Sequence, residues 1–160
     1  MDTELDRLFP RYLAGPSQAP VWCITPQIDR CIHRFYDTSP VSPSGRYVAL
    51  TRLPYEDKLP VAGDPAEIVL VDLVQGTTQI IAETRGWDTQ LGAQAQWGSD
   101  DHSLYFNDVD TQNWTPFGVR LDPSTGVSRR LGGPVYMVSP DGKLAVGDTS
   151  HVNKRPSARE

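Results

Sequence analysis

The chain has 160 residues and a mass of 17.7 kDa, a size that suits one ordinary domain. Acidic residues (20) outnumber basic residues (15), and the resulting net charge of −5 argues against a nucleic-acid partner bound through its phosphates. The longest apolar runs, such as 68–71, are far shorter than the ~20 residues of a membrane span, so no membrane contact is expected.

Residues 1–20 are expected to form an N-terminal segment, either a short helix or an extended lead-in. A helix over 2–8 would stop at Pro10, whose ring cannot continue it. The first six residues include three acidic ones where a secretory signal would be basic. This favours a cytoplasmic location; a longer parent protein would also permit a periplasmic one.

Cys23 and Cys31 are the two cysteines, with seven residues between them. We expect two free thiols, and the alternative is a disulfide bridge or a metal site. Neither cysteine belongs to a Cys-x-x-Cys pair of the kind that binds zinc. The sequence therefore assigns no metal site and no cofactor.

Three segments share one design, in which a short strand, a tight polar turn and a second strand follow one another. Aligning Gly45, Asp101 and Gly142 gives spacings of 56 and 41 residues. The two glycines supply the positive φ of a hairpin turn at little cost, and Asp101 is expected to adopt it in the middle copy. The three segments are 38–50, 94–106 and 135–146.

A second hairpin is predicted after each of the first two. Its strands are 67–73 and 77–83 in one copy, and 117–122 and 127–131 in the other. Strand 67–73 is apolar on both faces, as a strand between two sheets must be. Arg129 and Arg130 suit an edge strand that must not pair with other chains.

Two hairpins per repeat make a four-stranded unit of the size of a propeller blade. The predicted fold is all-β, a partial β-propeller of about two and a half four-stranded antiparallel blades over 21–150, followed by a polar tail over 151–160. Closed propellers have about four to eight blades. Missing blades of a longer chain, or other copies of this one, are therefore expected to cover the apolar sheet faces, and truncation is the simpler explanation.

The hairpins Ser-Pro-Ser-Gly-Arg-Tyr-Val-Ala (42–49) and Ser-Pro-Asp-Gly-Lys-Leu-Ala-Val (139–146) resemble TolB-type WD40-like propeller repeats. The blades are also similar to those of oligogalacturonate lyases, and the resemblance covers 21–148. It implies the fold and is unspecific for activity. The lyase likeness implies a histidine-rich manganese site and a basic catalytic residue, but this chain offers no His-x-His cluster for such ligands, which would lie beyond residue 160.

The segments leading into the innermost strands, 31–38 and 85–97, carry the polar residues expected to face a central channel. The 56-residue offset sets Arg34 opposite Gln90. An arginine guanidinium can pair bidentately with the carboxylate of a uronic sugar. Glutamine amides can hydrogen-bond sugar hydroxyls, and Trp87 can stack on a sugar ring. The alternative is that these residues tie blades together. The candidate ligand-binding residues are His33, Arg34, Asp37, Asp88, Gln90 and Gln94.

The remaining motifs are weaker. His102 is expected in a solvated turn, and His151 in the tail. The run 108–113 resembles the start of a calcium loop but lacks its glycine, so a strand end entering a solvated loop is expected. No Gly-x-Ser-x-Gly motif of a hydrolase is present.

The sequence thus predicts a non-catalytic or catalytically incomplete propeller segment that binds a ligand or partner in the channel between blades. One alternative is a fragment of an oligogalacturonate-lyase-like enzyme that cleaves uronides by β-elimination. Another is a structural scaffold for protein interaction. The expected partner is accordingly a carbohydrate (a uronide) or a protein.

Overall fold

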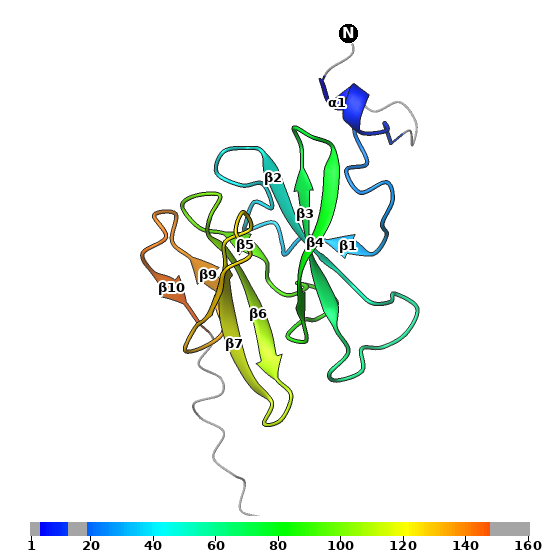
Figure 1. The fold of residues 1–160 in the computed structure, drawn as a ribbon. Helices are drawn as coiled ribbons and strands as arrows, with labels where there is room; N and C mark the ends of the chain where they lie inside the picture. The colour runs from blue at the N-terminus through cyan, green and yellow to red at the C-terminus, as the bar shows by residue number, and fades with distance from the viewer. Residues whose placement is uncertain (1–3, 13–18, 148–160) are drawn as a thin grey trace, which may run out of the picture.

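The computed structural model describes residues 4–12 and 19–147, and the predicted tail over 151–160, with His151, lies outside them. In this described part of the chain, one short helix, α1 (Glu4–Leu8), precedes ten strands. Within the described residues, no helix is long and apolar enough to cross a membrane. In Figure 1 two sheets lie next to each other, with a small hairpin beyond the second.

Both sheets have four antiparallel strands in chain order. The first contains β1 (Cys31–Ile32), β2 (Tyr47–Arg52), β3 (Ala66–Asp72) and β4 (Thr77–Thr84). The second contains β5 (Gln96–Trp97), β6 (Leu104–Asp110), β7 (Thr115–Leu121) and β8 (Ser128–Arg130). A hairpin of β9 (Met137–Val138) and β10 (Ala145–Val146) begins a third unit. The fold is therefore the predicted partial β-propeller, with two blades and the first hairpin of another.

The predicted repeat register is confirmed by the first hairpin of each blade. The backbone N–H of Ser42, Gly98 and Ser139 donates to the carbonyl five residues further on, and these positions are 56 and 41 residues apart. Gly45 and Gly142 have φ values of 79° and 69°, as expected.

The positive φ predicted for Asp101 is wrong, because this residue is not among the left-handed residues of the described chain. Its carboxylate instead accepts the backbone N–H of Ser44 at 3.1 Å, and the Ser44 hydroxyl as well. The turn of the second blade is therefore held against the turn of the first blade, and Asp101 needs no left-handed backbone.

The innermost strand of the first blade is interrupted. β1 pairs with the end of β2, and the pairing resumes further along the chain where Val41 bridges Val48. Residues 33–39 leave the sheet between these two points. The sequence located only the second part of this strand, because the residues of the excursion do not alternate between apolar and polar.

Both faces of β3 are buried, as its apolar sequence predicts. Ile68 belongs to the core between the two blades, together with Leu104 of β6. Val69 and Val71 point to the other face, where Phe9 packs against them. Additional residues that precede β1 cover this second face: Leu5, Leu8, Trp22, Ile24 and Ile28. On this side the chain itself covers a face for which missing blades or other copies were expected.

Side chains of one blade also bond the backbone of the next. Thr51 Oγ1 accepts the N–H of Ala93 at 3.0 Å. Asn107 occupies the same repeat position, 56 residues later, and its amide bonds both the carbonyl and the N–H of Val135, at 2.9 and 2.8 Å. Gln96 bonds the third unit in the same manner, at Tyr136 and Val138. Inter-blade ties were the alternative role expected for the polar residues of 85–97, and Gln96 is one of these residues.

We expect Asn107→Ala to lower the free energy of unfolding by about 2–3 kcal/mol, because it leaves two buried backbone groups of Val135 without partners. Asn113→Ala is the matched control, since Asn113 lies on an exposed turn and should cost under ~1 kcal/mol. Urea denaturation measures both values. Equal losses in the two variants would contradict a structural role for the inter-blade tie.

Candidate functional site

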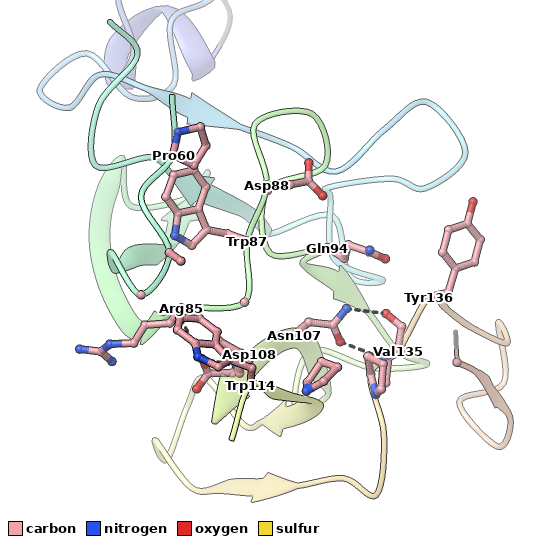
Figure 2. A pocket seen from close by; sticks show the side chains of 18 of the residues that line it. Pro60, Arg85, Trp87, Asp88, Gln94, Asn107, Asp108, Trp114, Val135 and Tyr136 are labelled. Carbon is pink, nitrogen blue, oxygen red and sulfur yellow. Dashed lines mark hydrogen bonds between the residues drawn. The ribbon is translucent and has the colours of Figure 1, made fainter. Parts of the chain in front are cut away.

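A cavity of about 960 Å³ lies at one end of the blades (Figure 2). Antiparallel pairing places the β2–β3 loop and the β4–β5 connection at the same end of a blade, and the pocket is lined from both. The end of β6, the β6–β7 turn, the start of β7, the segment before β9 and the end of β10 also contribute to the lining. This volume lies in the range of small-molecule sites, which are roughly 300–1,000 Å³.

Aromatic side chains supply much of the pocket wall. Trp87 is held in place by its Nε1–H, which donates to the carbonyl of Asp64 at 2.7 Å, and by the edge of the Tyr55 ring. Trp114 stands on the β6–β7 turn with 52% of its surface exposed, and Tyr136 lines the opposite side. The wall thus presents rings that a ligand can contact.

Backbone strain is concentrated at this pocket. Three non-glycine residues of the described chain have a positive φ, and two of them, Gln94 and Trp114 at 56° each, line the cavity. The left-handed region costs an L-residue roughly 1–2 kcal/mol. Gln94 also has a buried Oε1 without a hydrogen-bond partner among the described residues. Strained and unsatisfied residues of this kind gather at ligand-binding sites.

The charges that face the pocket are negative. Asp88 Oδ1 accepts the backbone N–H groups of Gln90 and Leu91, both at 2.7 Å. Asp108 Oδ1 accepts the N–H groups of Arg85 and Val109, both at 2.8 Å. The Arg85 guanidinium pairs with Glu83 at 2.8 Å and extends away from the centre of the pocket (Figure 2). Both acidic residues therefore line the cavity, and neither carboxylate has an ion-pair partner among the described residues.

A close approach of two segments positions these carboxylates. A Cβ on Gly86 would lie 2.6 Å from the Asp108 backbone, so only glycine permits this contact. The backbone N–H of Gly86 donates to Thr84 Oγ1, which in turn donates to the carbonyl of Asn107. The β4–β5 connection is thereby fastened to β6, and the loop that carries Asp88 starts from a rigid point.

Two of the six predicted residues, Asp88 and Gln94, line this pocket. Gln90 follows Asp88 but is exposed outside the lining. The other three, His33, Arg34 and Asp37, lie on the excursion over 33–39 and do not line the pocket. The 56-residue offset does not hold there, because these residues leave the sheet.

Arg34 is the buried member of the excursion. Its side chain is 1% exposed, and its guanidinium carbon lies 4.7 Å from the centre of the Tyr136 ring in the third unit. Its ion pair with Asp37 is long, at 3.6 Å, and Nε and Nη1 have no hydrogen-bond partner among the described residues. A residue of the first blade that reaches the third must lie near the propeller axis. Arg34 packs against Tyr136 there instead of presenting a fork to the pocket.

The two cysteines and His102, the other residues that the sequence analysis considered, lie outside the pocket lining. Both cysteines are free thiols, and burial raises the pKa of the Cys31 thiol, which makes its reactive thiolate scarcer. His102 is exposed in its turn, as predicted, and its Nδ1 lies 3.3 Å from Asp122 Oδ1. Within the described residues, no three His, Cys, Asp or Glu side chains gather as a metal site would require.

Sequence reasoning missed several lining residues, among them Asp108, Trp114 and Tyr136. The run from Asp108 to Asn113 was interpreted as a strand end entering a solvated loop, and β6 does end at Asp110 in a turn. That interpretation gave no binding role to Asp108, or to Trp114, which directly follows the run. Tyr136 was assigned only to a hairpin. An exposed tryptophan in a short turn between two strands is the feature that points to this site.

Fold and pocket together define an incomplete β-propeller with a cavity at one end. No family model matches the sequence, and no curated protein matches it. Among solved structures, the crystal structure of TolB from Acinetobacter baumannii is similar, with a TM-score of 0.54 and 20% sequence identity. The match covers 80% of this chain and 28% of that chain, so this chain spans less than a third of its neighbour's length. The likeness shows a TolB-like β-propeller fold.

Acid should weaken the hydrogen bonds of the Asp122 carboxylate, which join the turn at His102 to the turn at Ser124. Bonds from Ser124 and His102 hold the pKa of Asp122 at about 2, below its ordinary 3.8. A lowered pKa stabilises the folded chain above pH ~4, and this contribution is lost as the pH falls toward 2. The melting temperature of Asp122→Asn should therefore lie below that of the wild type at pH 6 and meet it near pH 2. A difference in melting temperature that stays constant from pH 6 to pH 2 would contradict a lowered pKa of Asp122.

The side chain of Arg34 should stabilise the fold by packing against Tyr136. We expect Arg34→Ala to lower the free energy of unfolding by about 2 kcal/mol, because it leaves a void beside Tyr136. Arg34→Met fills that space and removes a buried, incompletely paired charge, so it should cost under ~1 kcal/mol. Urea denaturation of the two variants separates volume from charge. Equal losses would mean that the charge itself stabilises the blades.

Proposed function

We propose that this chain is a non-catalytic propeller segment that binds a ligand or a partner in the pocket at the end of its blades. The observation that carries the proposal is the placement of two left-handed residues, Gln94 and Trp114, on the wall of one cavity. Their strain brings no evident gain in packing, since Trp114 is half exposed and the Gln94 oxygen has no hydrogen-bond partner in the described part of the chain. A ligand that contacts both residues would account for it.

An enzyme that cleaves uronides is the second candidate suggested by the sequence. It needs a cation to meet the substrate carboxylate, and Arg34 was the residue nominated for this role. Arg34 is buried against Tyr136, and Arg85 is paired with Glu83. The geometry therefore favours binding over this chemistry. A scaffold without a ligand is less favoured, because it gives no reason for strain at a concave site.

Indole N–H signals in NMR spectra test the proposal. The probes are chitotriose, its neutral N-acetylated form, trilysine and trigalacturonate. We expect at least one probe to shift the signals of Trp87 and Trp114, which line the pocket. The signals of Trp22 and Trp97 should stay in place, since neither residue lines the pocket. No shift of either pocket signal with any probe would overturn the proposal.

Trp114→Gly should separate binding from stability. Glycine adopts a φ of 56° without strain, so the variant should unfold with a free energy within about 1 kcal/mol of the wild type, while binding of the tightest probe weakens about tenfold. Trp114→Ala is the matched control: it loses the same ring, keeps the strain, and should be less stable than the glycine variant by about 1 kcal/mol. Thermal melts and titrations measure both. Unchanged probe binding in the two variants would remove Trp114 from the site.

A further inference from the structure

We infer that the end pocket takes a positively charged organic group, a primary ammonium carried by the ligand. This inference rests on the proposed binding function and specifies the chemistry of the ligand. It differs from the uronide that the sequence suggested, because a uronide would bring a negative charge. Three features of the pocket support it: the sign of its charges, the carboxylate oxygens left for a ligand, and its aromatic walls.

The sign of the charge follows from the lining. Asp88 and Asp108 are its acidic residues, and Arg85 is its one basic residue among those described. Arg85 is neutralised by Glu83 at 2.8 Å, and its guanidinium extends away from the pocket centre (Figure 2). A carboxylate in this cavity would meet two like charges, and an ammonium group would meet two opposite ones.

The carboxylates also have acceptor capacity. In Asp88 and in Asp108, every hydrogen bond made within the described residues falls on Oδ1. The donors are nearby backbone N–H groups and, for Asp108, the Thr84 hydroxyl as well, at 3.2 Å. The second oxygen of each remains to accept from a ligand. The backbone bonds fix the orientation of both carboxylates before any ligand arrives, so little ordering is needed on binding.

The walls fit the same ligand. Trp87 and Trp114 face the cavity, and indole rings attract ammonium groups more strongly than other aromatic side chains do. The chain already uses this interaction elsewhere, since the Lys58 ammonium lies 4.2 Å from the centre of the Tyr55 ring, beside Trp87. Carboxylates combined with open aromatic faces favour an organic cation over an anion or a neutral sugar.

The test ranks matched probes by charge at low salt, with the Trp87 and Trp114 indole signals as the readout. We expect chitotriose to bind about tenfold more tightly than its neutral N-acetylated form, and trigalacturonate to bind most weakly. Trilysine carries the same ammonium group on a peptide. Whichever of chitotriose and trilysine binds more tightly identifies a sugar or a peptide as the carrier, and either result supports the inference.

Asp88→Asn supplies the matched variant. Asparagine keeps an oxygen that accepts the Gln90 and Leu91 N–H groups, so the loop and the melting temperature should be preserved. Chitotriose binding should weaken at least about threefold, and binding of the neutral form should change little. Asp100→Asn is the control, because it removes the same charge from the turn before β6, outside the pocket lining, and also keeps the oxygen that accepts the His102 N–H.

Three results would overturn the inference. If trigalacturonate or the neutral sugar binds as tightly as chitotriose, the charge assignment fails while the proposed binding site stands. If Asp100→Asn weakens chitotriose binding as much as Asp88→Asn does, the attraction comes from net charge and not from the pocket. If none of the probes moves a pocket indole signal, the binding function fails together with the inference.

Discussion

The first blade of this protein has two apolar faces, and each face requires a covering layer. β3 shows the constraint most directly, since Ile68 and Val69 are neighbours in sequence, point to opposite faces, and are both fully buried. Ile68 packs against the second blade, whereas Val69 packs against the N-terminal segment around Phe9. Exposure of either face would cost roughly 25 cal/mol per Å² of apolar surface. The stacking of the blades, and hence the place of every loop at their ends, follows from this requirement.

Stacking alone would permit neighbouring blades to slide, and the polar ties remove that freedom. Thr51 and Asn107 stand at one repeat position, and each bonds the backbone that leads into the next unit. Directional hydrogen bonds set a register that non-directional apolar contact cannot. The loops that meet at the end of the blades are consequently held in one arrangement, and the two strained residues of the pocket can persist there.

Part of the site was predictable and part was not. Asp88 and Gln94 were identified because they lie in a polar segment that leads into a strand whose position the repeat reveals. Arg34 was identified by the same reasoning and has a different role, packing against Tyr136 near the axis. The repeat register could not place it, because the chain leaves the sheet between β1 and Val41, and an excursion has no periodicity to follow.

The sequence by itself determined the hairpins, their turns at Gly45 and Gly142, the four-stranded blades and their order along the chain. These features are local: the alternation of apolar residues and the φ of a turn depend on neighbours within a few positions. Only the tertiary structure decided that the N-terminal segment covers a face of the first blade, and that a cavity joins Asp88 to Asp108 and Trp114. A pocket built from several loops depends on how blades stack, and the packing that sets this stacking acts between residues far apart in the chain.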